Sequence, residues 1–93
     1  MKRYETVIIV DPDLSEDVRL PLFEKFRETI SQQQGELIAF EEWGSQKLAY
    51  EVRKKMRGFY VRVDYCGAGK AVDELERQCR LDDRVLKYLN CLT

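Results

Sequence analysis

The chain has 93 residues, of which 44% are hydrophobic and 35% are charged, and this composition is typical of one ordered domain spanning residues 1–93. Its 16 basic and 17 acidic residues leave a net charge of −1, which argues against a protein that coats nucleic acid through bulk charge alone. The sequence contains no histidine, so histidine-dependent catalysis and histidine-ligated metal sites are excluded.

The cysteines and the N-terminus indicate the cellular compartment. Cys66, Cys79 and Cys91 are odd in number and lack a C-x-x-C spacing, so we expect three reduced, mostly buried thiols and no disulfide framework or zinc site. No apolar run approaches the roughly 18 residues that a membrane span needs. The N-terminal residues lack the long apolar region of a signal peptide. We therefore expect a cytosolic protein that does not bind membranes.

The first predicted elements are a strand and a helix. Thr6–Val10 is a nearly continuous β-branched run, typical of a strand buried on both faces, and the proline-containing turn Asp11–Asp13 ends it. Apolar residues at helical spacing then predict a helix, with Val18, Leu22, Phe23, Phe26 and Ile30 on one face. Because proline is tolerated only in the first helical turn, Pro21 predicts that this helix begins no earlier than Asp17. Gly35 is predicted to end it in the left-handed conformation.

From Glu36 onward the hydrophobic period changes from 3.6 to 2. The alternation through Glu36–Val52 indicates either one long strand with an irregularity at Gly44 or two short strands. Lys54–Gly58 is predicted to form a basic turn, and Phe59–Tyr65 alternates as the next strand.

The remaining elements complete a recognisable order. After Gly67–Gly69, helical spacing predicts a second amphipathic helix with an apolar face formed by Val72, Leu75, Cys79 and Leu81. Val85–Leu92 is predicted to be the closing strand. The order β-α-β-β-α-β predicts an α+β, ferredoxin-like sandwich, in which a four-stranded antiparallel sheet carries two helices on one face and leaves the other face free.

Charge is strongly segregated along the chain. Residues 11–42 contain nine acidic and three basic residues, whereas residues 43–63 contain six basic residues against Glu51 alone. These cations are interleaved with aromatic residues, namely Trp43, Tyr50, Phe59 and Tyr60. We expect the cations to gather on a single surface, where they would neutralise phosphates.

Catalysis is not expected. Glu41 and Glu42 are adjacent on a predicted strand, so their carboxylates point to opposite faces and cannot share a ligand. Asp82 and Asp83 follow a helix at a turn, where aspartate is common. Cys66 has no histidine to activate its thiol. The sequence therefore predicts a protein that is not an enzyme and that needs no cofactor or metal.

Three binding functions remain. Arg57-Gly58-Phe59 opens like an RNA-recognition motif, but Tyr60 and the following residues break the match, so contact through loop-borne cations is the better RNA hypothesis. Alternatively, a protein partner binds the edge strand Leu37–Val52 or the free sheet face. The charged residues of the edge strand would instead serve to block its pairing with a strand of another chain. The third class is a regulatory module that binds a small molecule or oligomerises; neutralising Arg53–Arg57 would leave such a module intact.

Three blocks of the sequence carry a family resemblance. The first is Met1–Val7 followed by Asp11–Ser15, the second runs from Trp43-Gly44 through Lys47–Tyr50 to Tyr60, and the third is Leu75–Arg77 followed by Arg80–Lys87. In this order and at these intervals, the blocks resemble the family of the sixth protein of the bacterial small ribosomal subunit. Two departures are Glu51, where many relatives have proline, and the end at Thr93, where many relatives continue into a tail whose contacts we expect to be absent.

The resemblance implies a fold, a role and a set of contact residues. It implies a ferredoxin-like, non-catalytic component of the cytoplasmic ribosome that pairs with the eighteenth small-subunit protein and binds the central domain of 16S rRNA during assembly. By position it implies RNA contacts at Lys2, Arg3, Lys47, Lys54 and Lys87, to which the basic turn adds Arg53, Lys55 and Arg57. For the partner protein we look to the free sheet face and the strand near Trp43, with Trp43, Tyr50 and Tyr60 as candidates.

Overall fold

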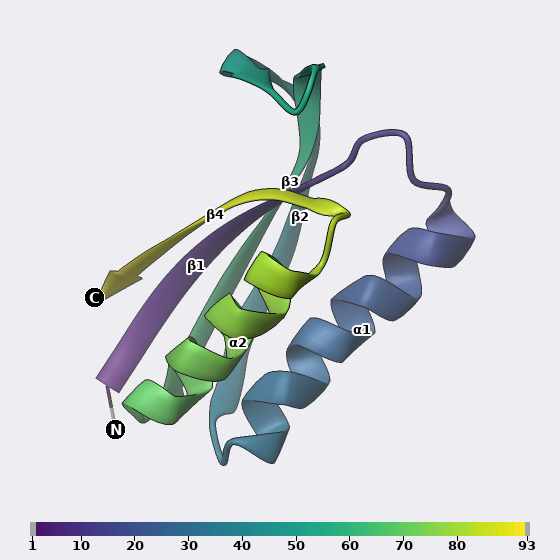
Figure 1. Ribbon diagram of the computed structural model, residues 1–93. Helices are drawn as coiled ribbons and strands as arrows, with labels where there is room; N and C mark the ends of the chain where they lie inside the picture. Colours follow the sequence, from purple (N-terminus) through teal and green to yellow (C-terminus); the bar gives the residue numbers. More distant parts are fainter. Residues whose placement is uncertain (1, 93) are drawn as a thin grey trace.

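The computed structural model describes residues 2–92 and contains six elements in the predicted order (Figure 1). These are β1 (Lys2–Val10), α1 (Glu16–Gln32), β2 (Glu36–Val52), β3 (Lys55–Gly67), α2 (Gly69–Leu81) and β4 (Val85–Leu92). The strands form one sheet in the order β2-β3-β1-β4, every neighbouring pair is antiparallel, and both helices cover the same face. The predicted ferredoxin-like α+β sandwich is therefore confirmed.

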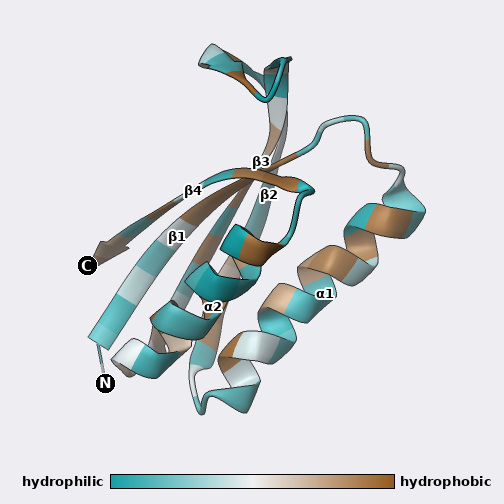
Figure 2. Cartoon of the chain, viewed as in Figure 1, coloured by the Kyte–Doolittle hydropathy of each residue, from teal (hydrophilic) through white to brown (hydrophobic). Residues whose placement is uncertain are grey.

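The core lies between the sheet and the two helices. Ile8 on β1 pairs with Val61 on β3, and both are fully buried because they face the helices. The helices add their buried apolar side chains to this layer, with Phe23 and Phe26 as the largest from α1, and Figure 2 shows hydrophobic segments on the strands and on both helices. The full cluster comprises Ile8, Val10, Leu22, Phe23, Phe26, Ile30, Val61, Val63, Tyr65, Ala71, Leu75, Cys79 and Val85. This burial fixes which side chains of each strand remain on the free face.

Helix α1 begins one residue earlier than predicted, at Glu16, and holds Pro21 inside its second turn. Proline is tolerated there because it and Asp17, whose carbonyl group would have accepted its missing N–H, are both exposed to water. The predicted apolar face is buried except at Val18, which is 38% exposed.

The end of α1 differs from the prediction that Gly35 adopts the left-handed conformation. Gln34 takes the positive φ, 62°, and its N–H donates to the carbonyl of Ser31, while the N–H of Gly35 donates to the carbonyl of Ile30. This pairing is the Schellman motif, with Gln34 in the position that glycine usually occupies. Glycine is needed at 35 for space, because an added Cβ would lie 2.9 Å from the carbonyl oxygen of Cys66.

Strand β2 is one continuous strand of 17 residues, which settles the alternative left open by its sequence. Its register against β3 shifts between Glu42 and Gly44, where Gly44 has a φ of 85°. The predicted basic turn over Lys54–Gly58 is wrong, because only Arg53 and Lys54 form the turn and β3 already begins at Lys55.

Two further expectations about burial need correction. Leu81 is 68% exposed at the end of α2 and does not belong to its apolar face. Of the three cysteines, only Cys79 is buried, whereas Cys66 is partly buried and Cys91 is exposed. Burial raises the pKa of the Cys79 thiol to about 12. Within residues 2–92, neither helix is long and apolar enough to cross a membrane.

Candidate nucleic-acid interface

The far ends of β2 and β3 form a hairpin that projects beyond the helices (Figure 1). We call residues 45–58 the hairpin arm. Its strands pair from Ser45 opposite Phe59 to Val52 opposite Lys55, and the turn between them has φ angles of 48° at Arg53 and 64° at Lys54. Two consecutive positive φ angles are typical of type I′ turns, whose twist matches that of antiparallel strands. The arm therefore carries two cations at its tip.

Four cations of the hairpin arm have no carboxylate partner among the described residues. Lys47 and Lys54 make no ion pair there. Arg57 donates to the hydroxyl of Ser45 at 3.2 Å and to its carbonyl oxygen at 3.1 Å. Arg53 donates to the carbonyl oxygen of Asp83 at 2.9 Å. These neutral acceptors orient the guanidinium groups but leave their charge available to an anion.

Lys55, the fifth cation of the hairpin arm, is paired within the chain. Its Nζ lies 2.5 Å from a carboxylate oxygen of Asp13 and 3.5 Å from one of Asp11. The hydrogen bond to Asp13 is the main cause of the raised pKa of Lys55. The acidic turn after β1 thus neutralises one side of the arm, and Lys55 adds less to the basic surface than its sequence position indicates.

The eight predicted RNA contacts do not form a single patch. Lys2 and Arg3 pair with Gly67 and Cys66, at the end of β3 opposite the hairpin arm. Arg3 is bidentate to Asp64, at 3.0 and 2.5 Å. The eight predicted contacts therefore do not lie on one surface, because antiparallel pairing places the start of β1 at the far end of the sheet.

Lys87, on β4, lies with the hairpin arm despite its distance in sequence. Its ammonium group donates to the hydroxyl of Tyr50 and lies 4.8 Å from the centroid of that ring. The contact is a cation–π interaction combined with a hydrogen bond to a neutral group. Lys87 therefore adds a cation beside the arm that pairs with no carboxylate among the described residues.

Arg62 belongs to the basic segment of the sequence, but the structure surrounds it with acids. Its guanidinium lies 3.0 Å from Glu5, 2.5 Å from Glu41 and 3.6 Å from Asp64. Hydrogen bonds to Glu5 and Glu41 raise its pKa. These partners come from three adjacent strands, so only the strand register could have revealed them. At this end of the free face, the basic and acidic side chains pair with one another and their charges nearly cancel.

The other end of the free face holds an apolar groove between the sheet and the hairpin arm. The groove has a volume of about 150 Å³ and is lined by Val7, Ile9, Leu48, Ala49, Tyr50, Val52, Tyr60, Lys87 and Leu89. Tyr50 and Tyr60, two of the predicted partner contacts, meet here. Trp43 does not line the groove and lies 47% exposed beside Gly44. Of the three predicted partner contacts, two therefore lie together in the groove, and Trp43 lies apart from them on the edge strand.

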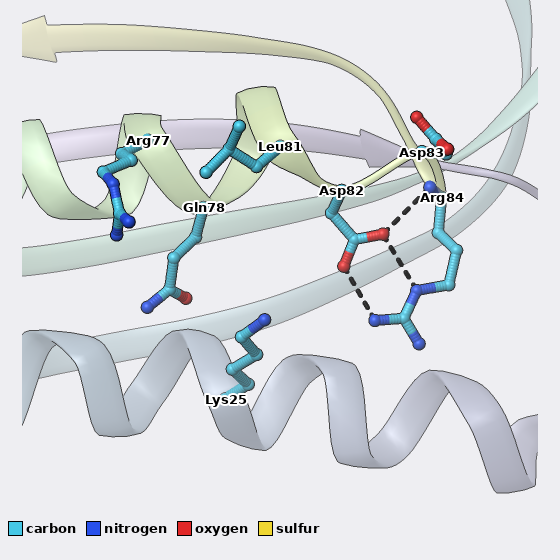
Figure 3. Close-up of a pocket in the computed structure, with 7 residues that line it drawn as sticks. All are labelled: Lys25, Arg77, Gln78, Leu81, Asp82, Asp83 and Arg84. Atoms are coloured by element: carbon cyan, nitrogen blue, oxygen red, sulfur yellow. Dashed lines mark hydrogen bonds and ion pairs between the residues drawn. The ribbon is translucent and has the colours of Figure 1, made fainter.

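A second, polar groove lies on the helical side, between α1 and α2 (Figure 3). Within it, Asp82 accepts from the backbone N–H of Arg84 and from two guanidinium nitrogens, at 2.9, 2.9 and 2.7 Å. The side-chain hydrogen bond from Arg84 is the main cause of the lowered pKa of Asp82. Asp82 thus orders the turn before β4. Across residues 2–92, no three metal-ligating side chains come together.

The family of the chain follows from its match to the family model described as Ribosomal protein S6, which covers residues 3–91. The chain belongs to the ribosomal protein S6 family. A small ribosomal subunit protein bS6 from Thermoanaerobacter pseudethanolicus is 45% identical, over 96% of this chain and 94% of its own length. The 30S ribosomal protein S6 from Thermotoga maritima has a solved structure with a TM-score of 0.92 and 26% identity, and the match covers 99% of this chain and 87% of that one.

Some relatives are much longer than this chain. The bS6 protein from Desulfatibacillum aliphaticivorans is 53% identical over 100% of this chain, and the one from Desulfosudis oleivorans is 53% identical over 96%. The chain covers 50% and 53% of those two proteins, and so spans about half their length.

Family membership decides several predictions. The resemblance itself and the prediction of a ribosomal, cytoplasmic protein that is not an enzyme are confirmed. The individual RNA contacts, the partner-facing residues and the pairing with the eighteenth small-subunit protein stay predictions.

Proposed function

We propose that this ribosomal protein S6 homologue binds the central domain of 16S rRNA together with the eighteenth small-subunit protein and so supports assembly of the small subunit. The observation that carries the proposal is the hairpin arm, which projects beyond the helices and carries Lys47, Arg53, Lys54 and Arg57 without carboxylate partners among the described residues. Unneutralised cations on a projecting element suit contact with phosphates in a folded RNA.

The proposed mode of RNA binding is phosphate contact, because the aromatic residues of the segment that opens like an RNA-recognition motif are only partly exposed. Phe59, the aromatic residue nearest the arm on β3, packs under α1 with its ring centroid 5.9 Å from that of Phe23. The guanidinium of Arg19 covers the Phe59 ring, 4.4 Å from its centroid. Tyr60, on the opposite face, is partly buried in the apolar groove. Neither ring offers the exposed stacking platform of an RNA-recognition motif.

The partner protein is proposed to cover the apolar groove. The groove is continuous with the hairpin arm through Tyr50, which lines it and also contacts Lys87. Leu89, 52% exposed, extends its apolar lining. A partner seated there would lie next to the RNA contacts, so that each ligand favours binding of the other.

The apolar groove itself does not suit a metabolite. Its volume of about 150 Å³ is smaller than the roughly 300–1,000 Å³ of typical small-molecule sites. An occupant that inserts a few apolar side chains fits this surface better than a whole metabolite.

The test is a binding titration with a central-domain 16S rRNA fragment, with and without the partner protein. We expect weak binding by the chain alone and much tighter binding with the partner. Five cations (Lys47, Arg53, Lys54, Arg57 and Lys87) predict a slope of log affinity against log salt of about −4. The double variant Lys47→Gln, Lys54→Gln should lower the magnitude of the slope by about 1.5 to 2.

The matched control is Lys25→Gln, Lys70→Gln, which removes the same charge from exposed positions on the helical side. We expect this control to bind RNA like the unaltered chain. Equal effects of the two double variants, or tight and sequence-selective binding without the partner, would contradict the proposal.

A further inference from the structure

A hollow between the turn of the hairpin arm, α2 and β4 is lined by basic side chains from these three parts of the fold. Arg53 comes from the turn, Arg80 from the last turn of α2 and Lys87 from β4. Its volume is about 280 Å³, and the other lining residues are Cys79, Val85, Leu86 and Tyr88. None of the described residues that line it is acidic, which sets it apart from the polar groove between the helices.

The three cations of this hollow are not neutralised within the described chain. Arg80 makes no ion pair there, and the partners of Arg53 and Lys87 are a carbonyl oxygen and a tyrosine hydroxyl. The neighbouring arginines on the same side of the fold behave differently. Arg77 pairs with Glu74 at 2.9 Å, and Arg84 pairs with Asp82 at 2.7 Å. The hollow thus concentrates positive charge that no carboxylate among residues 2–92 pairs with.

Three features nearby oppose an anion, namely the C-terminus of α2, Asp83 and Asp82. The C-terminus of α2 contributes a partial negative charge of about half a unit. Asp83 gives its carbonyl group to Arg53, but its carboxylate does not line the hollow, and Asp82 is held by Arg84. Three full positive charges outweigh these terms, so the hollow attracts an anion.

We infer that Arg53, Arg80 and Lys87 bind one phosphate group of the RNA backbone in this hollow. The inference rests on the proposed function and adds Arg80, which the sequence did not single out as an RNA contact. Arg53 belongs both to the hollow and to the tip of the hairpin arm. An RNA strand that contacts Lys54 would therefore continue into the hollow. Guanidinium groups match phosphate oxygens bidentately, which suits two arginines and one lysine around one phosphate.

The test compares two arginines of α2 in the RNA titration with the partner protein present. Arg80→Gln should weaken binding about tenfold and reduce the magnitude of the salt slope, by less than the loss of a whole phosphate contact, because Arg53 and Lys87 still hold the phosphate. Arg80→Lys should keep the slope, because it keeps the charge. Arg77→Gln removes the same charge one turn earlier and should leave affinity within about twofold, because Arg77 is already paired. Circular dichroism verifies that each variant is folded.

The outcomes separate this inference from the proposed function. If Arg80→Gln binds like Arg77→Gln while the Lys47→Gln, Lys54→Gln variant is weakened, the phosphate site is refuted and the proposed function stands. If the unaltered chain with its partner binds no RNA, both fall. A selective loss in Arg80→Gln supports both.

Discussion

Asp64 shows how a single residue on the free face depends on charge pairing. Its side chain is only 4% exposed, and Arg3 donates two hydrogen bonds to its carboxylate. These hydrogen bonds are the largest cause of the lowered pKa of Asp64, while burial opposes them. Arg62, 3.6 Å away, favours the charged form as well. The carboxylate is therefore stabilised as an anion only in the folded chain.

This pairing predicts an acid-dependent loss of stability. Because the folded pKa of Asp64 lies below its unfolded value of about 3.9, its contribution is present above that pH and is lost as pH falls through the folded pKa. Thermal unfolding followed by circular dichroism from pH 6 to pH 2.5 measures the effect. Asp64→Asn should be less stable than the unaltered chain near pH 6, and the difference should shrink at the acid end.

Asp73→Asn, an exposed position on α2, is the control. It should follow the unaltered chain across the whole range. If Asp64→Asn kept a constant difference at every pH, the ion pair with Arg3 would not be the source of its stabilisation.

Single residues also explain why the sequence predicted the RNA contacts only in part. A run of cations in the sequence indicates a basic segment but not the neighbours of each cation. Lys55 meets Asp13, 42 residues away, and Arg3 meets Asp64, 61 residues away. Strand register and loop packing decide these partners, and neither is encoded in local spacing. Arg80 was overlooked for the same reason, because its companions lie on two other elements.

At the scale of elements, the turn of the hairpin arm places one arginine and one lysine where asparagine and glycine are favoured. Positive φ angles at Arg53 and Lys54 are uncommon for residues with a Cβ, and each costs on the order of 1 kcal/mol. In return, two cations are held at the tip of the arm. The choice of residues therefore favours charge over local stability.

This compromise predicts opposite effects on stability and on binding. The double variant Arg53→Asn, Lys54→Gly should raise the free energy of unfolding by up to about 1 kcal/mol, because its residues favour positive φ angles. The loss of the hydrogen bond from Arg53 to Asp83 reduces this gain. Urea denaturation measures it. The same variant should weaken RNA binding about tenfold or more, because two cations are lost.

A variant that changes charge alone separates the two causes. Arg53→Gln, Lys54→Gln keeps the unfavourable backbone conformation, so it should weaken RNA binding without gaining stability. If the asparagine–glycine variant bound RNA like the unaltered chain, the turn cations would have no part in recognition.

The helices and strands themselves were largely predictable, because hydrophobic residues recur with a period of 3.6 in a helix and 2 in a strand that is buried on one face. The order of strands and helices and the span Val85–Leu92 were right for this reason. The turn at Arg53–Lys54 was displaced because it lacks the glycine or asparagine that marks a type I′ turn. Gly35 was misread for the converse reason, since it is needed there for space next to Cys66 and not for its φ.

At the scale of the whole molecule, the hairpin arm and the apolar groove place two proposed surfaces side by side. Leu89→Gln tests the groove. A bound partner would bury the exposed half of the Leu89 side chain. The substitution removes this apolar contact and forces an amide to be buried, so it should weaken partner binding about tenfold. Isothermal titration calorimetry with the purified partner measures the affinity.

Leu81→Gln is the control, because Leu81 is 68% exposed on the helical side and lies outside the groove. It should bind the partner normally. Equal losses in both variants would place the partner elsewhere, and the edge strand around Trp43 would be the next surface to test.

The sheet also has a consequence for how the chain matures during synthesis. Strand β1 lies between β3 and β4, so its earliest residues find their last neighbour only when residues 85–92 have been translated. Until then one side of β1 is an open edge, able to pair with other chains. In a nascent chain of this topology, the edge of β1 therefore stays open from its own synthesis until β4 has been made and paired.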